Sequence, residues 1–247
     1  MSLLRAVESS WLFVAAIGLL GFRAAEAKAC GVSASGVASC SLAEHEEAVR
    51  RRWVIGANGL FTSTRLRFSD DLHADQVRYA TLAMLAYLPS TRLVLQAGAG
   101  AALGGGLTLA DGEYRFSPGP TAMIGADFRA FDDGRYSLLL TSGLSFATAR
   151  TRAPGAGSSE AYTAFDLRLG VQFGIALGRV VVPYAVARVF GGPIFWRYQG
   201  QAVTGTDTHH YQLGAGLALR ATKALSFFVE GIPLGERAVA LGVSWAL

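Results

Sequence analysis

The segment TAFDLRLGVQFGIAL, residues 163–177, alternates strictly between two kinds of residue. Its odd positions from Phe165 to Leu177 are large and apolar, whereas its even positions carry only Ala, Asp, Arg, Gly or Gln. A period of two is the period of a β-strand, whose successive side chains point to opposite faces. The stretch therefore predicts a long strand with one strongly apolar face and one face of small or polar residues.

The same alternation begins at Trp53 and continues to the end of the chain. It predicts an all-β fold of about ten strands, at residues 53–67, 77–88, 92–104, 119–131, 135–148, 161–177, 180–197, 209–221, 225–231 and 236–247. The predicted connections alternate in length. Those at 88–91, 132–134, 178–179 and 222–224 are tight, whereas 68–76, 105–118, 149–160 and 198–208 are longer and rich in turn residues.

Tight turns on one rim and longer loops on the other are typical of a transmembrane, antiparallel, up-and-down β-barrel. Two places leave eight or twelve strands open. Asn58-Gly59 is a strong hairpin signal inside the first strand, and the connection at 232–235 is short where a long loop is expected. Irregular alternation near Gly191-Gly192-Pro193 also predicts a bulge in the seventh strand.

Composition decides which face of the sheet meets the surroundings. Charged residues are 16% of the chain, against about 25% in soluble domains. A soluble barrel would coat its outer face with charged residues, but here the second face is mostly Gly, Ala, Ser and Thr. We therefore expect the apolar face to meet lipid and the small face to line a wet or polar interior, where Gln172→Glu is harmless. A soluble periplasmic barrel that binds an apolar ligand is an alternative.

The first 27 residues are typical of a secretory signal peptide. Arg5 precedes an apolar core at residues 11–22, and Ala25-Glu26-Ala27 matches a cleavage site. A membrane anchor is the alternative interpretation. Residues 28–52 would then form a periplasmic segment, with a short helix from about 42 to 51 introduced by a capping box, and residues 53–247 the barrel.

Cys30 and Cys40 follow the cleavage site, and in an exported protein an even pair of cysteines predicts a disulfide. A lipid anchor on Cys40 is the alternative. The formal net charge of +4 is spread along the chain, which disfavours nucleic acid as a partner. The histidines and cysteines have no zinc-site spacing, so we expect neither a metal nor another cofactor.

Charged residues on the predicted interior face are the candidate site. Asp127 and Arg129 stand two apart on one strand, and Asp166 and Arg168 do so on another. The two residues of each pair can neutralise each other. The first pair lies toward the tight turns and the second toward the loops. The predicted polar network of the lumen comprises Asp127, Arg129, Asp166, Arg168, Arg188, Arg220 and Glu230. It is either structural or a constriction that selects small solutes or ions.

By this pattern, residues 53–247 resemble the bacterial outer-membrane β-barrel proteins. The ending ALGVSWAL is similar to their assembly signal, although the aromatic Trp245 stands two residues before the end. The resemblance implies export to the outer membrane of a Gram-negative bacterium. It also implies contact with lipid and lipopolysaccharide, and assembly by periplasmic chaperones and the barrel-insertion machinery.

Two predicted loops also resemble, weakly, those of the omptin proteases, ten-stranded barrels with an acidic pair facing an Asp-x-His. Asp207-Thr208-His209 and Asp111-Gly112-Glu113 stand at suitable positions, although Glu113 replaces the family's Asp and the flanking residues differ. The leading expectation is a non-enzymatic barrel, either a narrow pore or a surface and structural protein. An outer-loop hydrolase is the alternative.

Overall fold

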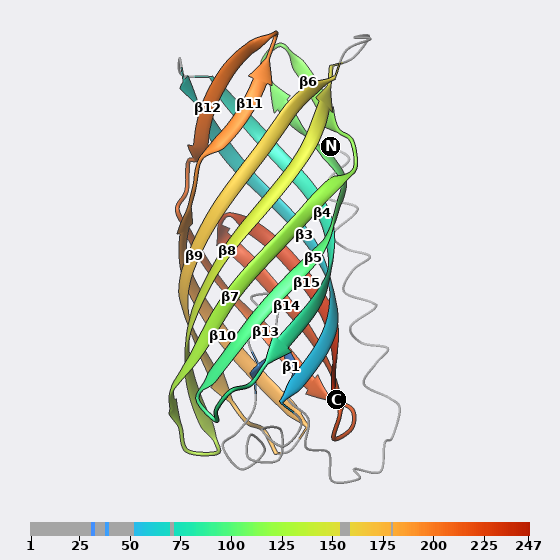
Figure 1. The fold of residues 1–247 in the computed structure, drawn as a ribbon. Coiled ribbons are helices and arrows are strands. Elements are labelled where there is room, and N and C mark those ends of the chain that lie inside the picture. Colours follow the sequence, from blue (N-terminus) through green and yellow to red (C-terminus); the bar gives the residue numbers. More distant parts are fainter. Residues whose placement is uncertain (1–30, 33–37, 40–51, 70–71, 154–158, 179) are drawn as a thin grey trace, which may run out of the picture.

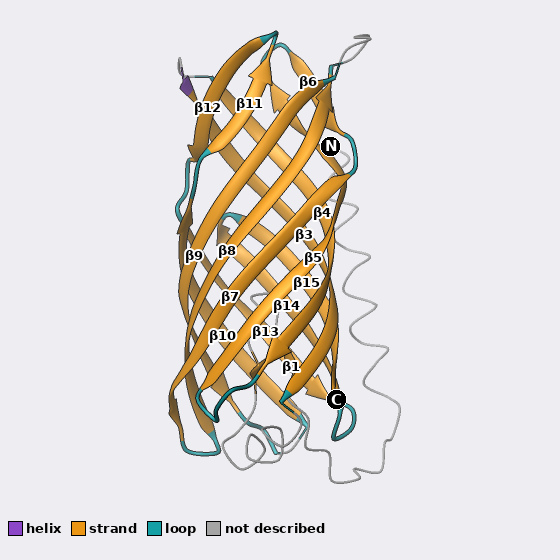
Figure 2. Cartoon of the chain, viewed as in Figure 1, coloured by secondary structure: helices purple, strands orange, loops and turns teal. Residues whose placement is uncertain are grey.

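The computed structural model describes residues 31–32, 38–39, 52–69, 72–153, 159–178 and 180–247. Nearly all of the described chain is β-strand (Figure 2). The strands are β1 (Gly31–Val32), β2 (Ala38–Ser39), β3 (Trp53–Phe68), β4 (His73–Tyr87), β5 (Leu93–Leu109), β6 (Gly112–Phe116), β7 (Gly119–Asp132), β8 (Tyr136–Arg152), β9 (Glu160–Ile175), β10 (Val181–Gly191), β11 (Ile194–Tyr198), β12 (Gln201–Asp207), β13 (Tyr211–Arg220), β14 (Leu225–Gly235) and β15 (Arg237–Ala246).

Thirteen of these strands form one sheet that closes on itself as a barrel (Figure 1). Antiparallel pairing runs from β3 through β4, β5, β7, β8, β9, β10, β13, β14 and β15, and β15 pairs again with β3. The short strands β6, β11 and β12 extend the sheet at one end of the barrel only. The fold is therefore the antiparallel β-barrel that the alternation predicts.

The short strands correct two of the predicted loops. Residues 105–118 were expected to form a loop, yet β5 extends to Leu109 and β6 adds five more strand residues. The expected loop at 198–208 contains β12, and the expected bulge after Gly191 separates β10 from β11. The polar and glycine-rich composition of these segments is typical of loops, and it concealed the apolar residues at every second position.

The hairpin signal Asn58-Gly59 lies in the middle of β3 and makes no turn. Asn58 points inward and is buried, and Gly59 pairs with Thr81 of β4 and Leu241 of β15. At the loop end, β14 continues to Gly235 and β15 begins at Arg237, so that connection is as short as the sequence indicates. Strand β3 therefore crosses the barrel unbroken.

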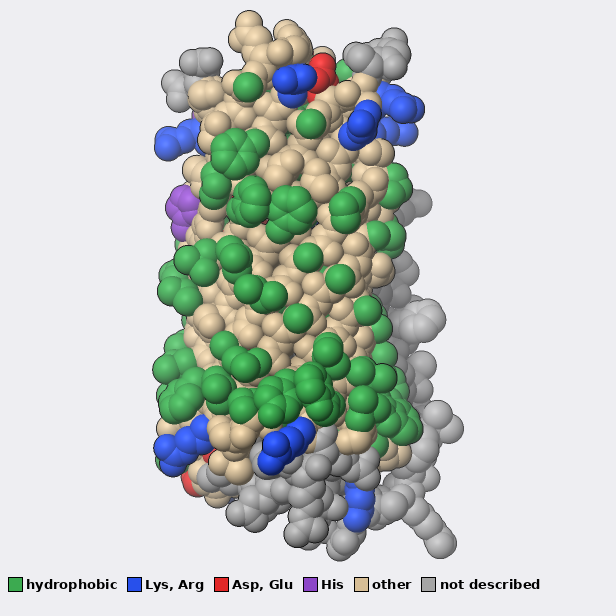
Figure 3. Space-filling view, in the orientation of Figure 1, with side chains coloured by type: hydrophobic (Ala, Val, Ile, Leu, Met, Phe, Trp, Pro, Cys, Tyr) green, Lys and Arg blue, Asp and Glu red, His purple; other side chains and the backbone are tan. Residues whose placement is uncertain are grey.

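The apolar face points outward, as the composition predicts. On β9, Leu167 and Leu169 are half exposed, whereas Gln172 on the opposite face is 1% exposed. Figure 3 shows apolar side chains spread over the barrel wall, with Lys and Arg gathered toward the two ends. Since a water-soluble barrel covers such side chains, this outer surface suits lipid.

The inward face carries polar side chains, as expected, and much of it is tightly packed. A Cβ on Gly216 would lie 2.3 Å from the ring of Tyr184, and one on Gly242 would lie 2.4 Å from the ring of Phe228. Inward-facing glycines thus make room for large neighbours, as in other small barrels whose interior is filled by side chains. Gln172 is buried in this packing, with neither amide atom hydrogen-bonded by a described residue.

Several predictions concern residues outside the described ranges. They are the signal peptide, the helix from about 42 to 51, and the disulfide between Cys30 and Cys40. Strands β1 and β2 pair with each other between these two cysteines. Within the described ranges, no helix is both long and apolar enough to cross a membrane.

Candidate functional site in the barrel interior

The interior changes in character along the barrel. At the tight-turn end, Val54, Leu88 and Val94 pack in a small apolar cluster. The middle holds charged side chains around a cavity. At the loop end, a larger cluster of apolar and aromatic side chains fills the barrel. The middle and the loop end both lie on any path through the barrel.

Arg188 and Glu230 form a buried ion pair in the middle of the barrel. They project from β10 and β14, the two neighbours of β13. Arg188 Nη1 and Nη2 donate to Glu230 Oε1 and Oε2 at 2.8 and 2.9 Å, and the side chains are 5% and 2% exposed. This two-bond geometry is the strongest arrangement that arginine and carboxylate adopt, so it fixes the two strands relative to each other.

Arg168 is the centre of a second charged group, nearer the loop end. It pairs with Asp166 on its own strand, and its Nη2 donates to Glu236 Oε2 at 3.1 Å. Glu236 also accepts a hydrogen bond of 2.6 Å from Gln212 Nε2. Glu236 was not among the predicted interior charges, although it is the first residue of the predicted strand 236–247 and its even number matches the inward positions of that strand.

The structure does not pair Asp127 with Arg129. Gln96 Nε2 donates to Asp127 at 3.0 Å, whereas Arg129 pairs with Asp132. The register shifts between Arg129 and Phe131, and this bulge turns the Asp132 side chain into the barrel, where it is 1% exposed. Arg220 lines a small cavity with Asp132 at the same end. The predicted network is thus divided into separate groups along the barrel.

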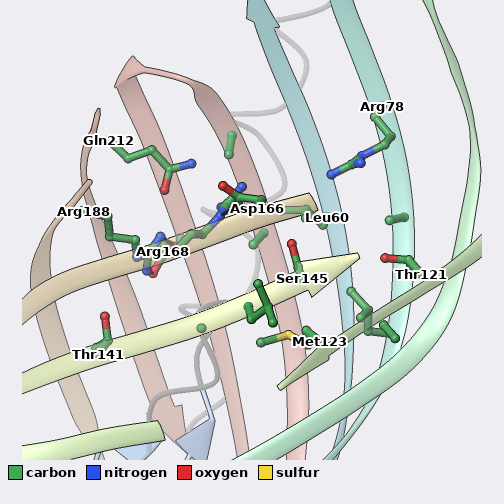
Figure 4. A pocket seen from close by; sticks show the side chains of 18 of the residues that line it. Leu60, Arg78, Thr121, Met123, Thr141, Ser145, Asp166, Arg168, Arg188 and Gln212 are labelled. Atoms are coloured by element: carbon green, nitrogen blue, oxygen red, sulfur yellow. Dashed lines mark hydrogen bonds and ion pairs between the residues drawn. The ribbon is translucent and has the colours of Figure 1, made fainter. Parts of the chain in front are cut away.

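A cavity of about 100 Å³ lies between these charged groups and the opposite wall. Figure 4 shows Arg78 of β4 reaching toward it from the side opposite Asp166 and Arg168. Asp166 Oδ1, Gln212 Oε1 and Arg188 Nε lack a hydrogen-bond partner within the described part of the chain. The volume suits about three water molecules, which would satisfy these atoms. The middle of the barrel is thus a small polar chamber.

Six aromatic residues at the loop end form what we call the aromatic cap: Phe68, Tyr114, Phe116, Tyr162, Trp196 and Tyr198. The rings of Phe68 and Tyr114 lie 5.4 and 5.3 Å from that of Trp196. Trp196 Nε1 donates to Thr151 Oγ1 at 2.9 Å, and Gln76 Nε2 donates to the Tyr162 hydroxyl at 2.7 Å. Trp196 and Tyr162 are each 2% exposed, so both side chains are packed inside the loop end of the barrel.

The aromatic cap was missed because its residues fall partly in predicted loops. Tyr114 and Phe116 are two apart in β6, and Leu107 and Leu109 are two apart in β5. This period of two was the available signal. It was obscured by Gly104–Gly106, which directly follow an irregularity of the β4–β5 ladder at Leu103.

In the structure, Asp207, His209 and Glu113 of the omptin-like pattern each have a different neighbour. Asp207 accepts a hydrogen bond of 2.9 Å from Thr64, whereas His209 is exposed, with its ring 6.1 Å from that of Tyr211 on the outer face. Glu113 contacts Arg115 at 3.5 Å. No hydrogen bond within the described ranges joins Asp207 to His209. Those ranges also hold no group of three His, Cys, Asp or Glu side chains able to bind a metal ion.

Asp111 ties two loop tips together. Its carboxylate accepts hydrogen bonds from the Tyr198 hydroxyl at 2.6 Å, the Tyr114 hydroxyl at 3.0 Å and Gln199 Nε2 at 3.4 Å. The bond from Tyr198 is the main cause of a lowered pKa for Asp111. Asp111 therefore joins the β5–β6 turn to the β11–β12 turn above the aromatic cap.

Comparison with known proteins shows the fold. No protein-family model and no curated protein sequence matches this chain. The outer-membrane protease OmpT of Escherichia coli is similar in structure, with a TM-score of 0.51 and 9% identity over 78% of this chain and 97% of that one. The transport unit of the Escherichia coli autotransporter AIDA-I has a TM-score of 0.45 and 10% identity, covering 79% and 90% of the respective chains. Together with the closed sheet and its outward apolar face, the OmpT likeness shows that this chain has the fold of the outer-membrane β-barrels.

Proposed function

We propose that this protein is a non-enzymatic outer-membrane barrel with a blocked interior, serving as a surface or structural protein rather than as a pore. The observation that carries the proposal is the aromatic cap, whose Trp196 and Tyr162 close the loop end. The ion pair of Arg188 with Glu230 is a second obstruction in series. In size this barrel lies between barrels of about eight strands, which side chains fill, and open porins of about sixteen strands.

The outer face supports the membrane location. Leu144, Leu167 and Ile124 lie on adjacent strands, and their outward side chains are half exposed rather than covered by polar side chains. A soluble barrel that held an apolar ligand would need an apolar interior at mid-height, where this chain places Arg168, Arg188 and Glu230. The proposal therefore favours lipid outside the barrel over an apolar ligand inside it.

Conductance across a planar lipid bilayer tests the blocked interior. We expect the inserted wild type to show no steady ion conductance. A variant that lacks both obstructions, Trp196→Ala and Tyr162→Ala combined with Arg188→Ser and Glu230→Ser, should conduct, which controls for insertion. Stepwise conductance by the wild type would overturn the blocked interior and support the narrow pore.

The hydrolase alternative has its own test. Asp207 accepts a hydrogen bond from Thr64, and no hydrogen bond among the described residues joins it to His209. We therefore expect no cleavage of basic peptides by folded protein in lipopolysaccharide. Cleavage by the wild type that is abolished by His209→Ala and retained by His210→Ala would overturn the non-enzymatic assignment.

A further inference from the structure

Three arginines crowd the outward face at the loop end, on the neighbouring strands β6 and β8. Arg115 is the direct cross-strand partner of Arg152, and Arg150 stands two residues from Arg152 on the same face. Their strand neighbours Phe116 and Thr151 pair with each other and are buried, so the arginines point away from the barrel. We call Arg115, Arg150 and Arg152 the arginine patch.

Like charges placed directly opposite each other destabilise a sheet. On β3 and β4, at the same end of the barrel, opposite charges face each other: Arg65 is the cross-strand partner of Asp75 and forms an ion pair with it at 2.8 Å. Among the described residues, the one ion pair of the arginine patch joins Arg115 to Glu113 at 3.5 Å. Arg152 forms no ion pair with any described residue. Glu160 is the cross-strand partner of Thr151, whose side chain points inward, so the outward face of the patch keeps an excess of positive charge.

The arginine patch adjoins the apolar wall of the barrel. Below it on the outward face of β8 lie Phe146 and Leu144, and the ring of Phe146 is 5.1 Å from that of Phe165 on β9. In a membrane these apolar side chains meet acyl chains, and the level just above them is that of the polar headgroups. Long loops mark the extracellular rim of such barrels, so this level belongs to the outer leaflet.

We infer that the arginine patch binds the phosphate groups of lipopolysaccharide, the phosphorylated glycolipid of the outer leaflet. A phosphate between Arg115 and Arg152 converts their repulsion into two attractions, and the planar guanidinium suits phosphate oxygens. The acyl chains of the same molecule lie on the apolar wall below. This inference rests on the proposed membrane location, and a lipid is favoured over free phosphate because the patch and the wall are continuous.

Titration with bisphosphorylated lipid A in detergent micelles tests the patch, with bound lipid measured by native mass spectrometry. We expect Arg115→Gln combined with Arg152→Gln to weaken binding at least tenfold. Arg150→Gln, which leaves the facing pair in place, should weaken it less. The matched control is Arg65→Gln at the same end of the barrel, because Arg65 is already neutralised by Asp75, and we expect its affinity to stay within twofold of wild type.

The same preparation separates the possible failures. A gel shift on boiling shows that each variant has closed its barrel, and removing the repelling pair should not impair closure. Equal binding by the double variant, equal binding of lipid A stripped of phosphate, or equal competition by inorganic phosphate would each overturn the lipid site. A wild type recovered in the soluble fraction without a gel shift would instead overturn the membrane proposal itself.

Discussion

The two halves of strand β3 place their apolar and polar side chains on opposite faces: apolar side chains face outward in one half and inward in the other. In the half near the tight turns, Ile55 faces outward and is 44% exposed, whereas Asn58 faces inward and is buried. In the half near the loops, Arg67 faces outward and Leu66 faces inward, fully buried. Strand β8 changes in the same way, from Leu140 and Leu144 on the outside to Arg150 and Arg152.

Length explains why the rule reverses. Strand β3 has 16 residues, which at about 3.3 Å per residue is about 53 Å. Tilted by roughly 40°, it rises about 40 Å, well beyond an apolar membrane band of about 25 Å. The lower half therefore has lipid outside and charged pairs inside. The upper half projects into water and builds an apolar core, as a soluble barrel does.

The upper half should suffer most from loss of its core. Trp196→Ala removes the centre of the aromatic cap and leaves the Thr151 hydroxyl without its donor, so we expect a loss of about 3–5 kcal/mol in the free energy of unfolding. Circular dichroism during denaturant unfolding in detergent measures this loss. Trp196→Phe keeps most of the packing and should cost less. A loss under about 1 kcal/mol for Trp196→Ala would show that the cap is not a core.

The lower half should suffer most from a charge on its outside. Leu169→Arg places a cation against lipid and should cost about 2–4 kcal/mol near the bilayer midplane. Ala161 lies on the same face of β9 but in the upper half, where outward residues are charged and face water. Ala161→Arg should therefore cost under about 1 kcal/mol, even beside Arg150. Equal losses at the two positions, measured by unfolding in lipid vesicles, would remove the distinction between the halves.

The lower half was well predicted because its alternation follows a single rule over many strands. Phe165 to Leu177 were assigned to the outside and Asp166 and Arg168 to the inside, and the structure places them so. The upper half was poorly predicted because a charged residue facing water in a strand resembles a loop residue. Arg115 and Glu113 thus concealed Tyr114 and Phe116.

The partners of the inward charges were beyond the sequence for a different reason. Arg188 meets Glu230 across an intervening strand, and Arg168 meets Glu236 at a distant turn. These contacts depend on strand order and register around the closed ring. A single bulge after Arg129 turns Asp132 inward, where the two side chains form an ion pair.

Gln172 tests how dry the lower interior is. Its side chain is 1% exposed, so Gln172→Glu adds a charge where water does not reach, and we expect a loss of about 1–3 kcal/mol. Gln172→Leu removes two unpaired polar atoms at similar volume and should be neutral or stabilising. Unfolding in detergent at pH 7 compares the two. If Gln172→Glu left the free energy of unfolding unchanged, water would reach this part of the interior after all.

The smallest expected effect is the pH dependence of the loop tips in the upper half. Hydrogen bonds from Tyr198, Tyr114 and Gln199 lower the pKa of Asp111 below its ordinary value of 3.8 in the folded protein. A lowered folded pKa means that the carboxylate stabilises the fold above about pH 4, and that this contribution is lost as the pH falls through the folded pKa. Because Asp111 is largely solvent-accessible, we expect only about 0.5–1 kcal/mol.

Asp111→Asn should remove most of this contribution while keeping the shape of the side chain. The free energy of unfolding of the wild type should exceed that of the variant from pH 5 to 7, and the two should converge between pH 4 and 2. The matched control is Asp75→Asn, which breaks an exposed pair with Arg65 and leaves the loop tips joined. Native-state hydrogen exchange in β6 and β11 should rise on acidification in the wild type and be high at every pH in Asp111→Asn. If exchange in β6 and β11 of the wild type did not change with pH, Asp111 would not be what holds the two loop tips together.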